Sequence, residues 1–507
     1  MNRKLWRLIK NGYANFECAA YVGGDHADWF QPQRGVHQGA PISMKLYQIY
    51  VNELIIELKD SPYGILIGNI NVTSPTFADD LSLLTLNKYG LNTLLSISDK
   101  YGKKWQFSFS VPKCAALLWG PDKEPNVKIH LGNQEIHIVD STKHMGIKLS
   151  TNSHNNGITE RISAAQMVLF AAKGIGSFNV PVSPLVLSKL YWSIGISKML
   201  YGLEVSPVSD TSIAELDKCH RKCARIVQGV SFNTPSPAPL ASIGWMTIKS
   251  YVALRKLLFL WHIIFLPVTN IYRIVALQVI GSVGCTVPPV NSSPILEMYR
   301  MAWIYGMEKM VWQSLLFGAT GTLQQAKHNT KRIIWDREHD EWRASRIMYS
   351  TLYTYCNSLD SIKPIAWWFY AKLNPSLLKK VCCTVSILLG SQPSHMQCNF
   401  KSRLCRMCDE QVNEDVTHII MKCNRYEVER RTGLNSISSC MPEAMFSCFC
   451  TKNDEEKARF LISGLNNSYV PEWFQLYGAI AMFVWNIYKR RKDLYDEIES
   501  EHTDTAL

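Results

Sequence analysis

Two adjacent carboxylates, Asp79 and Asp80, are the side chains of this sequence that indicate chemistry most directly. They follow a run of small and β-prone residues and precede the apolar residues 81–84, a pattern that predicts a strand, a tight acidic turn and a returning strand. Burying two like charges side by side is costly unless a cation lies between them. Magnesium suits hard carboxylate oxygens, and two-metal phosphoryl transfer needs such a cluster. An isolated Asp-Asp turn is more often just exposed, so the interpretation depends on neighbouring motifs.

Three further motifs flank the acidic pair. Upstream lies RGVHQGAPIS (residues 34–43), in which glycines and a proline end one element and Ser43 is placed to cap a helix over residues 45–58. Downstream lie WQFSFSVPKC (residues 105–114) and KHMGIKL (residues 143–149). Each motif alone is weak evidence, and the combination in this order is much stronger.

With FADD (residues 77–80), these motifs resemble the palm of reverse transcriptases, specifically those of non-LTR (LINE-like) retrotransposons. The resemblance implies RNA-directed DNA synthesis, with an RNA template, a DNA primer and dNTPs as partners. Asp79 would ligate catalytic Mg²⁺, and Asp80 would support the metal cluster. Gln38 and Gly39 would shape the template and nucleotide pocket, and Lys113 would approach the incoming triphosphate.

The sequence departs from that family in a few places. His37 stands where an arginine is common, Ser110 replaces a usual asparagine, and residues 143–146 replace a tyrosine-leucine-glycine motif. We regard these differences as tolerable drift. The resemblance covers residues 1–245 well and is looser beyond them.

A larger departure concerns the first catalytic aspartate. The family places it on a strand upstream of a segment that resembles KLWRLIKN (residues 4–11), near which this sequence begins. No aspartate precedes Asp25, and Asp25 and Asp28 lie in a stretch that predicts a hairpin turn. We therefore interpret the chain as an N-terminally truncated polymerase without fingers, and expect weak activity or none. A catalytically inactive nucleic-acid-binding remnant and a non-functional gene fragment are the alternatives.

Composition indicates an ordered intracellular protein that binds a polyanion. The 507 residues are 47% hydrophobic and 19% charged, enough for about three domains with cores of their own. The formal charge is +12, and most of the excess lies within residues 151–400. The longest apolar stretch, residues 257–268, is shorter than the roughly 20 residues of a membrane span. With no signal peptide and 15 cysteines that form no secreted framework, we expect a reducing compartment, nucleus or cytoplasm.

The periodicity predicts an α+β fold: a partial polymerase palm with an antiparallel sheet, then a mostly α-helical thumb and C-terminal region with a small zinc knuckle. In the palm we expect a helix over residues 91–105 and strands within 63–87, 107–119, 127–139 and 143–149. The predicted domains are a palm (1–149), a helical thumb-like domain (150–260), a helical region (261–395), a CCHC zinc knuckle (396–430) and a helical tail (431–507).

Basic side chains gather on one predicted thumb helix, residues 215–228. Its outer face carries Lys218, Arg221, Lys222 and Arg225. By the family resemblance this face rests on the primer–template duplex, and a solvated helix face is the equal alternative. Between residues 285 and 400, tryptophans alternate with basic residues, for which we favour core packing over single-strand binding. The basic run KRRK (residues 489–492) indicates a solvated helix end more than a nuclear address.

A second group of residues has metal-ligand spacing. Cys405, Cys408, His418 and Cys423 follow the pattern C-x2-C-x9-H-x4-C, which supplies four soft or borderline ligands for a tetrahedral structural Zn²⁺. We expect His418 and Cys423 to lie about one helical turn apart. Cys398 is an alternative ligand, and chance spacing in a cysteine-rich chain is the competing explanation. LINE-like enzymes carry a similar CCHC element after the thumb.

Overall fold

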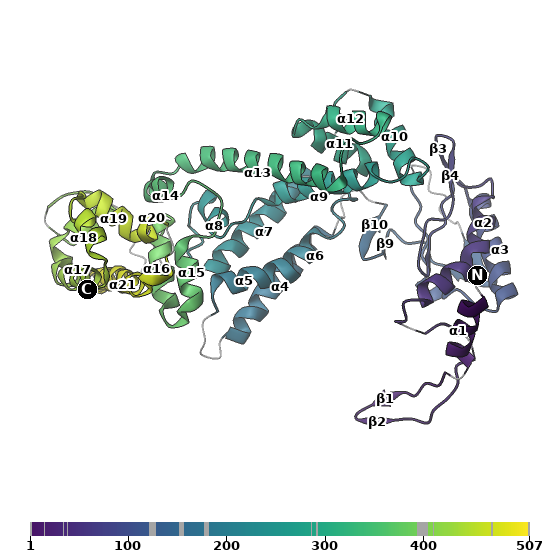
Figure 1. Ribbon diagram of the computed structural model, residues 1–507, viewed down its shortest axis with the longest axis horizontal. Coiled ribbons are helices and arrows are strands. Elements are labelled where there is room, and N and C mark those ends of the chain that lie inside the picture. Colours follow the sequence, from purple (N-terminus) through teal and green to yellow (C-terminus); the bar gives the residue numbers. More distant parts are fainter. Residues whose placement is uncertain are drawn as a thin grey trace. The chain divides into compact units, whose positions relative to one another are not determined.

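The computed structural model divides the chain into two compact units, Met1–Thr142 and Lys143–Leu507 (Figure 1). The structure describes residues 3–14, 16–33, 35–37, 39–120, 128–151, 157–176, 182–284, 286–289, 293–392, 404–408, 410–467 and 470–504.

The first unit is a mixture of helices and small antiparallel sheets, each of two strands among the described residues. The predicted helices over 45–58 and 91–105 are confirmed as α2 and α3. The elements are α1 (Arg3–Ala14), β1 (Tyr21–Val22), β2 (Asp25–His26), α2 (Ser43–Lys59), β3 (Ile65–Ile67), β4 (Ile70–Val72), β5 (Thr76–Phe77), β6 (Asp80–Leu81), α3 (Lys88–Trp105), β7 (Ile129–Leu131) and β8 (Gln134–Ile136). The boundary between the two units falls within β9 (Ser141–His144), which forms a hairpin with β10 (Ile147–Ser150).

The predicted strand over residues 107–119 is wrong. This segment contains a 3-10 helix, Val111–Lys113, and makes only an isolated bridge between Ala116 and Ile138. Pro112 lies within the 3-10 helix. Proline has no backbone N–H to give to a strand ladder and a φ that suits the first turn of a helix.

The core of the first unit lies between α2 and α3. Leu54 and Leu58 of α2 meet Leu94 and Tyr101 of α3, and all four are buried. The Tyr101 hydroxyl also donates a hydrogen bond to the Tyr50 carbonyl at 2.6 Å. The two helices therefore form the base on which the neighbouring hairpins rest.

The second unit is almost entirely helical after the β9–β10 hairpin, as the periodicity predicts. Its helices are α4 (Ile158–Gly176), α5 (Pro184–Leu190), α6 (Ser197–Leu200), α7 (Asp210–Gln228), α8 (Pro237–Ala241), α9 (Ile248–Ile264), α10 (Ile271–Val283), α11 (Pro294–Ile304), α12 (Glu308–Phe317), α13 (Leu323–Ile347), α14 (Tyr353–Ser358), α15 (Ala366–Leu373), α16 (Leu378–Leu388), α17 (Glu427–Cys440), α18 (Glu443–Cys450), α19 (Asp454–Ile462), α20 (Gly464–Asn467) and α21 (Phe474–Asp504).

Within the second unit, α9 packs against α11 and α13, and α21 packs against α16 and α17 (Figure 1). Trp342, Trp367 and Trp368 are buried, which confirms core packing for these tryptophans. The apolar residues 257–264 form the end of α9, with Leu257, Leu260 and Ile264 fully buried. Across the described residues, no helix combines the length and hydropathy needed to cross a lipid bilayer.

Because Leu94 packs in the core between α2 and α3, we expect that shortening its side chain will destabilise the first unit. Leu94→Ala should destabilise the first unit by about 2–5 kcal/mol, because Leu94 is completely buried and its loss leaves a cavity. Hydrogen exchange measured by mass spectrometry should then show faster exchange in α2 and α3 and unchanged exchange in α21. Leu86→Ala is the control, since Leu86 is 79% exposed. Equal exchange in the two variants would contradict the assignment of this core.

Candidate functional site

The acidic pair lies at the tip of a β-hairpin. In the antiparallel pair β5–β6, Phe77 lies opposite Asp80, and Ala78 and Asp79 form the turn. Ala78 takes a φ of 53°, a left-handed conformation that two-residue hairpin turns require. Backbone hydrogen bonds from Ser82 to Pro75 and from Leu84 to Thr73 extend the ladder. The predicted strand, turn and returning strand are present.

Successive side chains of β6 and the residues after it point to opposite faces, and this determines where the carboxylates lie. Leu81 and Leu83 pack against the α2–α3 core, so Asp80 faces away from that core. Asp79 occupies the turn, and both aspartates are exposed. Among the described residues, neither carboxylate takes part in an ion pair. The hairpin therefore presents two charged oxygen ligands to solvent.

Asp79 lies close enough to the first turns of α2 to influence a tyrosine there. Burial, and after it the negative charge of Asp79, raises the pKa of Tyr47 above its usual value. Tyr47 is half-buried in α2, the helix that follows the glycine-containing loop. The charge of Asp79 therefore acts on a side chain of α2.

The loop before α2 is held by His37 and Ser43. The Ser43 hydroxyl donates to the His37 carbonyl, and the His37 ring lies 3.7 Å from the ring of Phe16, between centroids. Gly39 has a φ of +84°, which favours glycine. The predicted capping role of Ser43 is wrong, because Ile42 is the N-cap residue and Ser43 already belongs to the helix. Gln38 lies outside the described residues.

Lys113 ends the 3-10 helix and is exposed. Two residues before it, Val111 packs with Leu83 and Phe109 against the β7–β8 pair. Leu83 and Phe109 also contact the α2–α3 core. Shared packing thus links the segment that carries Lys113 with the hairpin that carries the aspartates.

The four predicted zinc ligands converge. The ligand atoms of Cys405, Cys408, His418 and Cys423 all lie within 4.8 Å of one another, and all four residues are buried. Cys408 Sγ lies 3.5 Å from His418 Nε2. Zinc bonds of about 2.0–2.3 Å require a closely similar arrangement. The donor set and its convergence fit a structural Zn²⁺ site, and Cys398, the alternative ligand, lies outside the described residues.

The turn between the last two ligands is a π-helix, His418–Lys422, rather than an α-helical turn. The Cys423 N–H donates to the His418 carbonyl at 2.7 Å, which closes the wider i to i+5 ring. In an α-helix, residues five apart point in different directions, whereas the π-turn brings them onto one side. This geometry explains how an x4 spacing supplies two ligands to one point.

Charged side chains hold the cluster from two sides. Arg430 of α17 donates to the carbonyls of Ile420 and Cys423. Arg491 of α21 is 1% exposed and forms a two-pronged ion pair with Glu414, at 2.9 and 2.7 Å. Glu414 lies in the loop between Cys408 and His418. These contacts place the ligand-bearing loops in the helical core rather than on a separate knuckle.

Burial dominates the electrostatics of the cluster. It is the largest cause of a raised pKa for the Cys405 thiol, and it raises the pKa of Cys423 to about 12, with the neighbouring Cys405 and Cys408 contributing. Gathering thiolates here without a cation would be unfavourable. A divalent metal reverses that balance by stabilising the deprotonated sulfurs.

Comparison with known proteins addresses the first unit and the hairpin beyond it. Residues 3–149 match the profile of the family "Reverse transcriptase (RNA-dependent DNA polymerase)". The match includes α2, the acidic hairpin and β9–β10. Residues 3–149 are a reverse transcriptase domain. The predicted resemblance of this segment to reverse transcriptases is confirmed.

The chain is distantly similar to two retrotransposon polyproteins. The "Retrovirus-related Pol polyprotein from type-1 retrotransposable element R2" of Nasonia vitripennis is 25% identical over 239 residues, 44% of this chain and 22% of that protein. The "Retrovirus-related Pol polyprotein from type-2 retrotransposable element R2DM" of Drosophila melanogaster is 27% identical over 153 residues, 28% of this chain and 14% of that protein. The chain thus spans about a fifth or less of the length of these relatives.

Beyond the reverse transcriptase domain, the basic face of α7 carries two arginines that bind the backbone and two lysines that are exposed. Arg225 donates to the Thr234 carbonyl, and Arg221 donates to the Ser236 carbonyl and pairs with Asp217. These arginines hold the proline-rich loop that leads into α8. Lys218 and Lys222 are exposed on the same helix. The lysines are therefore the more accessible cations.

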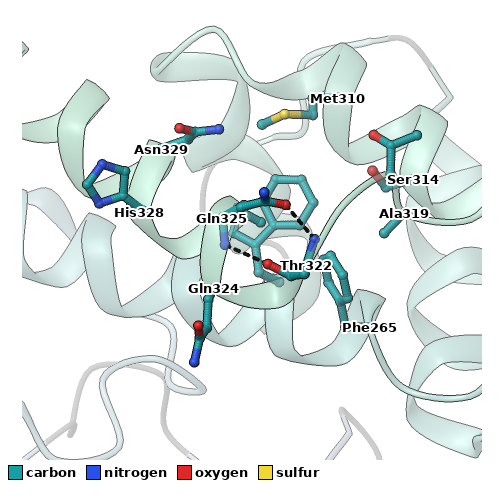
Figure 2. A pocket seen from close by; sticks show the side chains of 12 residues that line it. Phe265, Met310, Ser314, Ala319, Thr322, Gln324, Gln325, His328 and Asn329 are labelled. Carbon is teal, nitrogen blue, oxygen red and sulfur yellow. Dashed lines mark hydrogen bonds between the residues drawn. The ribbon is translucent and has the colours of Figure 1, made fainter.

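A pocket of about 860 Å³ opens beside the start of α13 (Figure 2). Trp261 and Phe265 help to line it, as do Thr322 and Gln325, which form a capping box with two hydrogen bonds. Of the residues that line it, none is an arginine or a lysine. The pocket therefore does not suit a triphosphate, and the capping box already gives the Gln325 N–H of α13 a partner.

Sequence reasoning missed Arg430, Arg491 and Glu414 as supports of the cluster. Within the basic run 489–492, a solvated helix end is the wrong interpretation for Arg491, because this side chain is buried. Its signal in the sequence is weak: an arginine surrounded by other basic residues looks exposed, and its partner Glu414 is 77 residues away. Tyr47 likewise carries no motif.

Metal analysis of the full chain tests the cluster. We expect about one zinc per chain, and a loss of at least half of it in Cys408→Ser, because three ligands hold zinc far less tightly than four. Cys448→Ser is the matched control, since Cys448 is exposed and lies outside the cluster. Equal zinc content in the two variants would rule out the assignment.

Metal removal should also loosen the core around the cluster. Cys405, Cys408 and Cys423 belong to the same buried cluster as residues of α16 and α21. Chelation should therefore speed hydrogen exchange in α17 and α21 while α2 and α3 keep their protection. Unchanged exchange in α17 and α21 after complete chelation would contradict a structural role for the metal.

Proposed function

We propose that the chain carries out RNA-directed DNA polymerisation as part of a non-LTR retrotransposon protein. The observation that carries the proposal is the hairpin tip, where Asp79 and Asp80 are exposed next to each other on a ladder anchored by Leu81 and Leu83. The reverse transcriptase family match and the distant similarity to R2 polyproteins support it.

The proposed roles follow from where the side chains lie. Asp79, exposed in the hairpin turn, would be a direct metal ligand. Asp80 lies on the outer face of the strand and would complete or support the metal shell. Gly39, in the loop before α2, would border the template and nucleotide pocket together with Gln38. Lys113 would contact the triphosphate through its exposed ammonium group.

Magnesium, when bound, would polarise the phosphate that is attacked and stabilise the leaving group. The two carboxylates fit such an ion because hard oxygen ligands suit it and no cation pairs with them among the described residues. The contribution of the chain itself is to position the two negatively charged carboxylates. The α2–α3 core holds the hairpin, so both carboxylates stay in place without reorganisation during the reaction.

Nucleic-acid binding would extend into the helical region. Lys218 and Lys222 would contact phosphates of the primer–template duplex, while Arg221 and Arg225 would support them by fixing the adjoining loop. The zinc cluster would stabilise the C-terminal core that carries α21. We propose the predicted palm, thumb, helical region, zinc element and tail as functional divisions of the chain.

A catalytically inactive nucleic-acid-binding protein is the second candidate. One observation favours it: in the described part of the chain, groups of three or more metal-binding side chains occur only at the cysteine cluster. The hairpin thus offers two carboxylates, and two-metal sites commonly use more. Slow extension, rather than none, is the expectation under the polymerase proposal.

Primer extension on an RNA template separates the two candidates. With recombinant residues 1–507, we expect slow magnesium-dependent extension that Asp79→Asn lowers by at least roughly 100-fold, since it removes a charged ligand. Asp60→Asn is the matched control, because Asp60 is exposed at the end of α2. Binding of the primed template should be the same in all three proteins.

Two results would count against polymerisation. One is extension that Asp79→Asn leaves intact, because the hairpin would then not be the metal site. The other is tight template binding with no extension at any magnesium concentration, which is the behaviour of the inactive binding protein.

A further inference from the structure

The β9–β10 hairpin, which contains the KHMGIKL motif, is the last element of the reverse transcriptase domain. Met145 and Gly146 form its turn with φ of 51° and 75°, as in a type I′ turn. A left-handed φ is uncommon for a side chain as large as methionine, and such a residue persists only where its surroundings hold it. The helical region that follows the hairpin supplies this support.

Tyr201, directly after α6, holds the turn in place. Its hydroxyl donates a hydrogen bond to the Met145 carbonyl at 2.8 Å. Its ring lies so close to the turn that a Cβ atom added to Gly146 would be 3.3 Å from Tyr201 Cε1. Tyr201 is itself fixed by Arg161 of α4, whose guanidinium group donates to the Tyr201 carbonyl. The turn is therefore connected to α4 through one tyrosine.

Two further contacts join the returning strand, β10, to the helices. Gly202 approaches Ile147 so closely that a Cβ atom added to Gly202 would be 2.7 Å from Ile147 Cγ1. Lys148 pairs with Glu160 of α4 at 3.7 Å. The helical region thus supports the hairpin both at its turn and at its second strand.

Helix α4 also contacts α7, the helix that exposes Lys218 and Lys222. The first turn of α4 carries the residues that hold the hairpin. Farther along the same helix, Gln166 donates a hydrogen bond to Cys219 Sγ of α7 at 3.6 Å. Figure 1 shows α4 beside α6, and α4 packs against both α6 and α7. The hairpin and the exposed lysines of α7 are therefore held by one helix.

We propose that Tyr201 is a positioning residue, which fixes the β9–β10 hairpin so that Lys143 contacts a phosphate of the primer–template duplex. Lys143 lies on β9 and is exposed. Its charge reaches Glu160, but that carboxylate pairs with Lys148. A cation on an immobilised hairpin gains a phosphate contact with little further loss of conformational freedom. The inference rests on the proposed function for its ligand, the primed template, and binding alone tests it.

Fluorescence anisotropy of a labelled DNA primer annealed to an RNA template, with the full chain and without dNTPs, measures this contact. Tyr201→Phe removes only the hydroxyl and should raise the Kd by roughly 3-fold or more, as expected for the loss of one hydrogen bond. Tyr272→Phe is the matched control, because Tyr272 lies on α10 and is 65% exposed. Its Kd should equal that of the parent chain.

Salt dependence tests whether Tyr201 acts through the lysine. Lys143→Gln should make log K fall less steeply with log salt by about 0.9, the contribution of one phosphate contact on a duplex. Tyr201→Phe should also reduce the slope, whereas a general loss of stability would not. The double variant should bind no more weakly than Lys143→Gln alone, since both changes remove the same contact. Lys309→Gln, an exposed lysine of α12, should leave the slope unchanged.

A pair of glycine substitutions tests the support at the second strand. Gly202→Ala should displace Ile147 and raise the Kd at least as much as Tyr201→Phe does. Gly306→Ala is the control, because a Cβ atom there meets no other atom within 4 Å. The two glycines have φ of 72° and 68°, so the backbone strain of each alanine is similar.

Three results would overturn the inference. The first is equal affinity of Tyr201→Phe and Tyr272→Phe for the primed template. The second is an additive loss of affinity in the double variant, with the salt slope of Tyr201→Phe unchanged, because the tyrosine would then not act through Lys143. The third is a parent chain that does not bind the primed template. Binding without extension contradicts polymerisation alone and leaves these comparisons valid, so the two proposals fail separately.

Discussion

The burial of two leucines decides the geometry of the reverse transcriptase domain. Because successive side chains of a strand point to opposite faces, packing Leu81 and Leu83 on the α2–α3 core directs Asp80 outward and leaves Asp79 to the turn. A register shift of one residue would bury the carboxylates and expose the leucines, both of which are unfavourable. Hydrophobic packing therefore positions the two carboxylates of the hairpin.

In the helical unit, buried or half-buried arginines hold neighbouring segments in place. Arg221 and Arg225 donate to backbone carbonyls of the proline-rich loop, and so hold this loop against α7. Arg430 and Arg491 do the equivalent for the cysteine cluster. In each case one guanidinium group joins two segments of the chain. Its planar, fixed set of N–H donors suits this role better than the ammonium group of a lysine.

Local patterns were sufficient to predict the elements that carry the site, and distant contacts were not. The helices over 45–58 and 91–105, the acidic hairpin and the four cysteine and histidine ligands follow from short-range periodicity and spacing. The 3-10 helix at Val111–Lys113 arises where a proline interrupts an otherwise strand-like sequence. Arg491 finds Glu414 across 77 residues, and no short-range signal reports such a pairing.

The length of the π-turn between His418 and Cys423 sets the relative position of these two ligands. Its side chains can vary, since Ile419 and Ile420 need only be apolar to fill the core, but its length cannot. Deleting one residue would restore an α-helical turn and rotate Cys423 by about 100° away from the other ligands. In related sequences this segment should therefore tolerate substitution far better than insertion or deletion, and its length should be a more faithful marker of the element than its composition.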